Sequence, residues 1–230
     1  MKSIVIYNSK RGSTEQYARW IAEDIKAEQC IALEHADFHA LDQFDVVVFG
    51  GWIRGSGIVG LDKLKKSVPE IFSRLVIFGV GISRLTPENY MQIVDINLNT
   101  KDDRWNNVPL HVLPGRYDPS QVAGLDKFLM AVSKRVMISG RVSDKDQGAM
   151  EMKAAIEKGV DRMDRKAVEP VVKSVYKICG MPPVADASDD SDVDEKDRNS
   201  GGEGSGQDGG GDPADTDAIM REMLSRHDQE

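Results

Sequence analysis

The sequence predicts an α/β fold in which five parallel strands form one sheet with helices on both faces. At the start of the chain, a β-branched and aromatic run at residues 4–7 ends in a polar loop, and apolar residues then recur at helical spacing from Tyr17 to Ile25. Short runs rich in valine and isoleucine recur between further helical patterns. Because these runs are continuously apolar, the strands are expected to be covered on both faces, as in a parallel sheet.

The other elements follow in the same way along the chain. After the strand at 4–7, strands are expected at residues 31–34, 45–49, 75–80 and 109–113. Helices are expected at residues 61–72, 87–98, 122–138 and 167–179. Pro170 falls in the first turn of the last helix, where its missing N–H costs little.

The charge of the chain is unevenly distributed. Residues 184–230 hold 15 Asp and Glu against four Lys and Arg, a net charge of −11. The whole chain carries −8, so residues 1–183 carry about +3. The acidic balance therefore belongs to the C-terminal part and says little about the folded part.

The composition also divides the chain. Residues 186–215 combine Asp, Ser and Gly with almost no large apolar side chain, so they cannot bury enough surface to offset the entropy of ordering. We therefore expect one domain at 1–181 and an acidic, mostly disordered tail at 182–230. Within the tail, residues 216–226 are expected to form either a short docking helix or a frayed end.

Several functional classes find no support in the sequence. Cys30 and Cys179 are too few for a disulfide framework and lack metal-ligand spacing, and the four histidines are scattered. The modest positive balance of residues 1–183 is not interleaved with aromatic residues. Neither a metal site nor a nucleic-acid partner is expected.

The expected localisation is cytoplasmic. Met1 and Lys2 lead directly into the first strand without a signal peptide, and no apolar run approaches the roughly 20 residues needed to cross a bilayer. The expected helix at 122–138 carries an apolar stripe with Lys and Arg nearby, as on helices that rest on anionic lipid. This apolar stripe either makes a peripheral contact with the inner face of the membrane or packs on the sheet.

The loop after the first strand is suited to binding an oxyanion. Every residue from Asn8 to Thr14 is polar or glycine. Such a loop presents backbone N–H groups at the positive end of a helix, and Ser9, Ser13 and Thr14 add hydroxyl donors. The loop has neither the glycine-lysine pattern of nucleoside triphosphate sites nor the glycine triplet of dinucleotide sites, which favours a single phosphate monoester. The alternative is that these residues are ordinary helix caps.

In a doubly wound sheet, ligands bind outside the carboxyl ends of the strands, at the switch between the first and third strands. The segment Gly50–Gly57 lies there and places four glycines around Trp52. Glycine permits close approach of a flat ring to the backbone. Trp52 or Ile53 could cover one face of such a ring, and Arg54 could contact its edge or an anionic substrate. The alternative is a flexible loop with Trp52 packed on the sheet edge.

The run Ser9-Lys10-Arg11-Gly12-Ser13-Thr14 resembles the flavin mononucleotide (FMN) phosphate loop of flavodoxins, usually Thr/Ser-x-Thr-Gly-x-Thr. Ser9, Gly12 and Thr14 match this pattern, whereas Lys10 and Arg11 depart from it. The resemblance implies a flavodoxin-like doubly wound sheet of strand order 2-1-3-4-5 that binds FMN non-covalently. The implied phosphate contacts are Ser9, Gly12, Ser13 and Thr14, with Lys10 and Arg11 adding positive charge. The residues expected to flank the ring are Trp52, Ile53, Arg54, Gly55, Val80, Gly81 and Ile82.

Further segments sharpen the resemblance. The segments Gly51–Gly55, Leu64–Lys66, Gly115–Asp118 and Leu125–Met130 look like those of the flavodoxin-domain family that contains the menaquinone-dependent protoporphyrinogen IX dehydrogenases. The similarity covers roughly residues 3–178. It implies an FMN-dependent oxidoreductase that passes electrons from a reduced substrate, such as protoporphyrinogen IX, to a quinone. No catalytic side chain is assigned, because the flavin ring carries the redox chemistry.

The charge near this edge separates the competing functions. Lys10, Arg11, Arg54 and Arg116 make the mouth of the expected site basic, whereas electron-carrier flavodoxins usually show an acidic face there. This favours an anionic substrate, with Arg54, Arg116 and Tyr117 as candidate contacts, or an acidic protein partner. A flavodoxin-type electron carrier and a non-catalytic interaction module on the same fold are the alternatives, and a homo-oligomer is left open.

Overall fold

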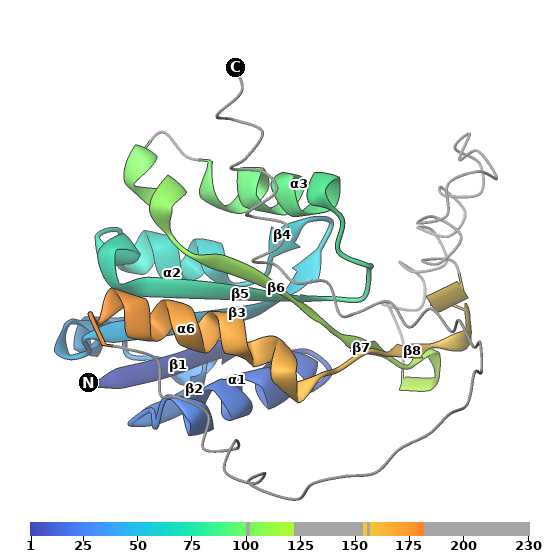
Figure 1. Ribbon diagram of the computed structural model, residues 1–230, viewed down its shortest axis with the longest axis horizontal. Coiled ribbons are helices and arrows are strands. Elements are labelled where there is room, and N and C mark those ends of the chain that lie inside the picture. Colours follow the sequence, from blue (N-terminus) through green and yellow to red (C-terminus); the bar gives the residue numbers. More distant parts are fainter. Residues whose placement is uncertain (100–101, 122–153, 156, 182–230) are drawn as a thin grey trace, which may run out of the picture.

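The computed structural model describes residues 1–99, 102–121, 154–155 and 157–181 (Figure 1). Five parallel strands form the main sheet in the order β2-β1-β3-β5-β6. Counted along the chain, this is the expected order 2-1-3-4-5, so the predicted fold class is confirmed. The strands are β1 (Ser3–Asn8), β2 (Gln29–Ala32), β3 (Val46–Arg54), β5 (Leu75–Gly81) and β6 (Leu110–Pro114).

Helices cover both faces of the sheet, and each face has its own hydrophobic core (Figure 1). One face is covered by α1 (Ser13–Asp24) and α6 (Glu169–Ile178), and the other by α2 (Leu61–Ser67) and α3 (Pro87–Leu98). Successive residues of a strand point to opposite faces. The core under α1 and α6 therefore includes Val5, Tyr17, Ile21, Val171 and Val175, and the other core includes Ile4, Ile6, Leu61, Leu64 and Ile93.

Helix α2 ends earlier than the sequence pattern suggests. It stops at Ser67 instead of residue 72, because Pro69 disfavours a helical conformation at the preceding residue, Val68. Val68 has φ −138° and ψ 74°, outside the helical region. The chain resumes as a 3-10 turn at Ile71–Arg74, which buries Ile71 in the core.

The second strand also differs from its expected range of 31–34. It spans Gln29–Ala32, in parallel register with Ile4 to Tyr7 of β1. Leu33 then begins a 3-10 turn at Leu33–His35 and buries its side chain in the core. An apolar residue is therefore buried at this point without belonging to the strand.

The structure adds three short strands that the sequence pattern does not show. β4 (Gly57–Ile58) pairs antiparallel with the end of β3. β7 (Arg116–Tyr117) pairs antiparallel with β8 (Val160–Asp161) as a separate two-stranded sheet. The remaining 3-10 turns are Phe38–Gln43, Asp103–Asn107, Pro119–Gln121 and Arg165–Val168.

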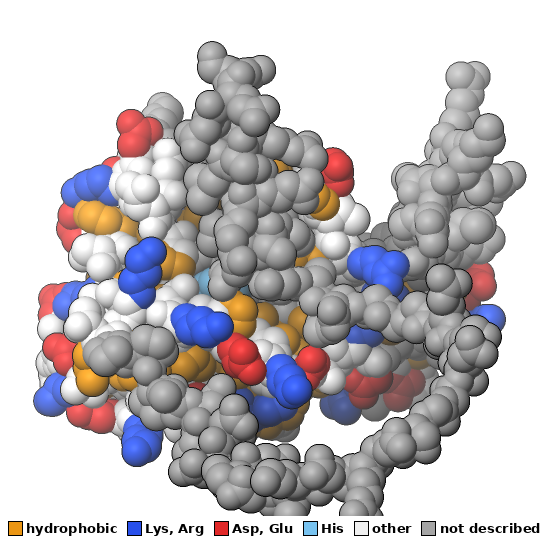
Figure 2. Space-filling view, viewed as in Figure 1, with side chains coloured by type: hydrophobic (Ala, Val, Ile, Leu, Met, Phe, Trp, Pro, Cys, Tyr) orange, Lys and Arg blue, Asp and Glu red, His pale blue; other side chains and the backbone are white. Residues whose placement is uncertain are grey.

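Some expectations fall outside the described residues. These are the helix at 122–138 with its apolar stripe, and the tail at 182–230 with its short helix at 216–226. Within the described ranges, no helix is long and apolar enough to span a membrane. On the face shown in Figure 2, basic and acidic side chains are interspersed.

Tyr17 joins α1 to two distant segments near the carboxyl end of the sheet. Its side chain is fully buried. The hydroxyl donates to the carbonyl oxygen of Pro114 at the end of β6 (2.7 Å) and accepts from the backbone N–H of Asp164 (3.0 Å). Burial raises the pKa of Tyr17 to about 12, so the hydroxyl keeps its proton at neutral pH.

We predict that Tyr17→Phe lowers the free energy of unfolding by about 1–2 kcal/mol, because it leaves two half-buried backbone groups without this partner. Urea unfolding measures the loss. Tyr176→Phe is the matched control with a smaller expected effect, since its hydroxyl contacts the carbonyl oxygen of Asp24 at 3.4 Å.

The pH dependence provides a second check. An unfolded tyrosine titrates near pH 10.0, whereas folded Tyr17 holds its proton to about pH 12. The folded state thus binds more protons in this window, and the stability that Tyr17 supplies should fall as pH rises from 10 to 12. A wild-type advantage over Tyr17→Phe that grows across this window would contradict the hydroxyl's role.

Candidate functional site

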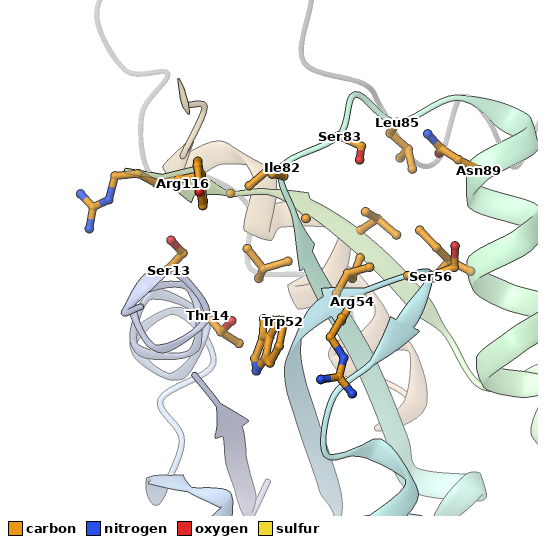
Figure 3. A pocket seen from close by; sticks show the side chains of 18 of the residues that line it. Ser13, Thr14, Trp52, Arg54, Ser56, Ile82, Ser83, Leu85, Asn89 and Arg116 are labelled. Carbon is orange, nitrogen blue, oxygen red and sulfur yellow. The ribbon is translucent and has the colours of Figure 1, made fainter. Parts of the chain in front are cut away.

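A cavity of about 620 Å³ lies at the carboxyl ends of the parallel strands. Its volume is within the range of small-molecule and cofactor sites. Figure 3 shows the start of α1 on one side, with Ser13 and Thr14, and Asn89 of α3 on the other. Trp52 and Arg54 from the end of β3 lie between these two sides (Figure 3).

The loop before α1 has the geometry of an oxyanion site. Gly12 adopts φ 86°, a left-handed conformation that favours glycine, and α1 begins at the next residue. The Gly12 N–H donates to Ser9 Oγ (3.1 Å), which closes the loop. The first N–H groups of a helix have no partner within the helix and point toward its positive end.

Ser13 gives the strongest sign that this loop binds a ligand. Its side chain is buried, and its Oγ has no hydrogen-bond partner among the residues that the structure describes. A buried hydroxyl without a partner costs about 1–3 kcal/mol. An anion at the start of α1 would accept hydrogen bonds from this hydroxyl and from backbone N–H groups. The loop therefore fits a phosphate group.

Aromatic rings contact three of the basic side chains at the cavity. Lys10 Nζ lies 5.4 Å, and Arg54 Cζ 5.8 Å, from the ring centroid of Trp52. Arg11 Cζ lies 5.4 Å from the ring centroid of Tyr117, which is buried. These distances are those of cation–π contacts. The positive charge is thus fixed near the start of α1 and the end of β3.

The cavity lining is basic and, among its described residues, has no carboxylate, imidazole or thiol. Among its described lining residues, five are basic and none is Asp, Glu, His or Cys. Such a site attracts anions but offers no carboxylate, imidazole or thiol to exchange protons with a substrate. The basic residues are Lys10, Arg11, Arg54, Arg84 and Arg116.

The structure brings most of the predicted site residues together. Ser9 and Gly12 do not line the cavity; the Gly12 N–H donates to Ser9 Oγ within the loop. The predicted residues that line it are Lys10, Arg11, Ser13, Thr14, Trp52, Ile53, Arg54, Gly55, Val80, Gly81, Ile82, Arg116 and Tyr117. Their roles in binding stay predictions.

The side of the cavity formed by α3 was not assigned from sequence. Its position could have been inferred from the capping box that starts α3: Thr86 Oγ accepts from the Asn89 N–H (3.3 Å), and Asn89 Oδ1 accepts from the Thr86 N–H (2.9 Å). The lining residues outside the predicted site set are Ser56, Ser83, Arg84, Leu85, Asn89, Gln92, Ile93, Val112 and Gly115.

One glycine pattern has a different role from the one its spacing suggests. Gly55-Ser56-Gly57-Ile58-Val59-Gly60 has the spacing of a dinucleotide-binding motif. In the structure, Gly55 lies in the tight turn between β3 and β4, and Gly57 pairs with β3. Such a motif requires a turn that leads directly from strand to helix. The spacing therefore carries no indication of a dinucleotide here.

Comparisons with known proteins agree with this architecture. Residues 4–144, more than half of the chain, match the family model described as Flavodoxin domain. Similar solved structures include flavodoxin 2 from Bacillus cereus, with 18% identity over 59% of this chain and 99% of that one and a TM-score of 0.38. A WrbA-like flavodoxin from Agrobacterium tumefaciens shows 14% identity over 48% and 82%, with a TM-score of 0.36.

A flavodoxin from the domain Archaea shows 15% identity over 53% of this chain and 87% of that one, with a TM-score of 0.35. Among curated proteins, none matches the chain. The family model, and not these distant structures, carries the assignment that follows.

We predict that Ser13→Ala is as stable as the wild type without ligand, or more stable by up to about 2 kcal/mol, because it removes a buried hydroxyl that has no partner. Inorganic phosphate should protect it less against urea than it protects the wild type. Ser9→Ala is the contrasting variant: it should be less stable without ligand, since it removes the acceptor of the Gly12 N–H. A Ser13→Ala protein destabilised in the absence of phosphate would refute the oxyanion assignment.

Proposed function

Since the chain belongs to the flavodoxin domain family, whose cofactor is FMN, we propose that it is an FMN-dependent oxidoreductase acting on an anionic reduced substrate. The observation that carries this proposal is the lining of the cavity, with five basic residues and no acidic, His or Cys residue among the described ones. With no carboxylate, imidazole or thiol among these residues, we assign the redox step to a bound cofactor. The basic lining selects for anions.

The start of α1 would hold the phosphate of FMN. Gly12 keeps the loop close to the helix start, and Ser13 supplies the buried hydroxyl. Thr14 is also buried and lines the cavity, while Lys10 and Arg11 add positive charge. The phosphate of FMN would thus supply the hydrogen-bond acceptor that the Ser13 hydroxyl lacks.

The ends of β3 and β5 would flank the ring of FMN. Trp52 offers a half-buried aromatic surface, and Val80–Ile82 offers apolar side chains and a glycine. When bound, FMN supplies the transfer of electrons, and the protein sets its position and its electrostatic surroundings. Ile53, Arg54 and Gly55 complete this side of the site as proposed.

The basic residues differ in how well they could bind an anionic substrate. Arg116 lies 3.8 Å from the Asp161 carboxylate, which offsets part of its charge. Tyr117 is buried and packs against Arg11, so it is better suited to holding Arg11 than to contacting a substrate. Arg54, exposed and in contact with the Trp52 ring, is the best-placed candidate.

A reduced tetrapyrrole with carboxylate groups, such as protoporphyrinogen IX, fits this charge, with a quinone as acceptor. In net terms, each turnover moves two electrons and two protons from the donor to the quinone, which becomes a quinol. Support comes from the basic lining and from the segments that resemble protoporphyrinogen dehydrogenases. Fold alone does not fix the substrate. An electron carrier, the other function compatible with the family, would need no anionic donor in the cavity.

We predict that the purified protein, reconstituted with FMN and desalted, retains the visible absorption of oxidised flavin. An Arg11→Glu, Thr14→Ala variant should lose most of it, because the change places negative charge beside the phosphate and removes a buried hydroxyl. Lys173→Glu, an exposed change in α6 away from the cavity, is the control and should retain FMN. A colourless wild-type protein would rule out the proposed function.

We further predict that Arg54→Gln raises KM for protoporphyrinogen IX roughly two- to fivefold, with little change in kcat, because an exposed charge contributes modestly to binding. Anaerobic turnover with a soluble menaquinone analogue measures this. A neutral reduced donor serves as the control, since its KM should not change. Equal effects on both donors would mean that Arg54 does not select for negative charge.

A further inference from the structure

We propose that Asn97 is a positioning residue for the cavity: it fixes the β3–β4 turn, and through it Trp52 and Arg54, in the arrangement that receives the FMN ring. The inference rests on the proposed binding of FMN. Asn97 lies near the C-terminal end of α3 and does not itself line the cavity. Its effect would reach the ring only through the turn.

The β3–β4 turn has a conformation that its sequence does not fully favour. Ile53 pairs with Ile58 and Arg54 with Gly57, which leaves Gly55 and Ser56 as the two central residues. Both have positive φ, 54° and 64°. Hairpin turns of this kind prefer Asn-Gly or Gly-Gly, and a serine at positive φ is strained. Something outside the hairpin must therefore help to hold it.

The side chain of Asn97 provides this support. Its Oδ1 accepts from the N–H of Ile58 (2.8 Å), and its Nδ2 donates to the carbonyl oxygen of Ser56 (2.7 Å). The second Nδ2 hydrogen is used within α3, in a bond to the carbonyl oxygen of Ile93 (2.7 Å). The orientation of the amide follows from its partners, one donor and two acceptors. Asn97 is 6% exposed, so these bonds are shielded from water.

Asn97 is itself held from the other side. The ammonium group of Lys65 on α2 donates to the backbone carbonyl oxygen of Asn97 and lies 4.6 Å from the ring centroid of Trp105. Burial lowers the pKa of Lys65, in keeping with its enclosed position. The turn is therefore linked through Asn97 to two helices of this face.

Movement of the β3–β4 turn would displace residues at the part of the cavity proposed to flank the FMN ring. Ile53 and Ile58 pack closely over Gly79 of β5, where a Cβ would lie 2.9 Å from Ile53 Cδ1 and 3.2 Å from Ile58 Cδ1. Ile53 Cδ1 also lies 3.4 Å from the Cβ position of Gly81, a residue of the cavity lining. The hairpin thus rests on the strand end that would flank the ring. The phosphate loop, in contrast, lies at the start of α1, on the other side of the cavity (Figure 3).

The test compares binding of three ligands: FMN, riboflavin and inorganic phosphate. Asn97→Ala should weaken FMN and riboflavin binding about tenfold, as expected for the loss of roughly 1.4 kcal/mol. Protection by inorganic phosphate should stay unchanged. The reduction potential of bound FMN should also shift, since Arg54 would no longer be fixed beside the ring.

A second substitution asks whether the effect passes through the turn. Adding Ser56→Gly to Asn97→Ala should restore most of the riboflavin affinity, because glycine favours the positive φ of this turn without external support. Tyr90→Phe is the matched control: it also removes a buried hydrogen bond of α3, from the Tyr90 hydroxyl to the carbonyl oxygen of Leu110 (2.9 Å), but it does not touch the hairpin. Tyr90→Phe should bind all three ligands as the wild type does.

The outcomes separate this inference from the proposed function. A wild type that binds no FMN overturns both. If the wild type binds FMN, then unchanged riboflavin binding by Asn97→Ala, equal losses for phosphate and riboflavin, or a failure of Ser56→Gly to restore binding overturns the role of Asn97 alone. Should Asn97→Ala not fold, Asn97→Asp replaces it. That variant keeps the acceptor for the Ile58 N–H but loses the donation to Ser56, so the same comparison applies.

Discussion

The hydroxyl of Tyr17 fixes the position of α1, on which the phosphate side of the cavity depends. The helix starts at Ser13, one turn before Tyr17, so the bonds of Tyr17 to Pro114 and Asp164 act close to the loop. They tie the start of α1 to the end of β6 and to the segment before α6. Loops are the most mobile parts of a fold, yet an anion site requires fixed N–H groups. The buried side chain of Tyr17 holds the helix start, and with it the N–H groups, in a fixed position.

The chemistry of the cavity follows from what its lining contains. The five cations of the lining would repel each other, but three of them lie against aromatic rings, and Arg116 lies near the Asp161 carboxylate. These contacts keep the positively charged side chains in place beside the cavity. The same charge that would bind the FMN phosphate also extends along the mouth. An anionic substrate would therefore be attracted to the site that holds the cofactor.

The main sheet could be predicted from sequence because its strands are continuous apolar runs between helical patterns. The polar loop that starts α1 could also be predicted, since local residue types determine such a loop; its role in binding phosphate stays a prediction. The conformation of the β3–β4 turn could not be predicted from local residue types. This conformation depends on Asn97, about 40 residues away, and a polar residue within an amphipathic helix gives no sign of such a partner. The end of α2 at Ser67 could have been read from Pro69.

The two sides of the cavity are built on different principles, and this has a consequence for function. The phosphate side uses groups within ten residues of each other on one loop and helix, and Tyr17 ties that helix to β6 and to the segment before α6. The ring side uses a two-residue turn held by a side chain from α3, whose own position depends on α2 through Lys65. Affinity for the phosphate and the environment of the ring can therefore change separately. A substitution on the α2–α3 face, far from the phosphate, is the kind of change that would tune the redox properties of the site without loss of its cofactor.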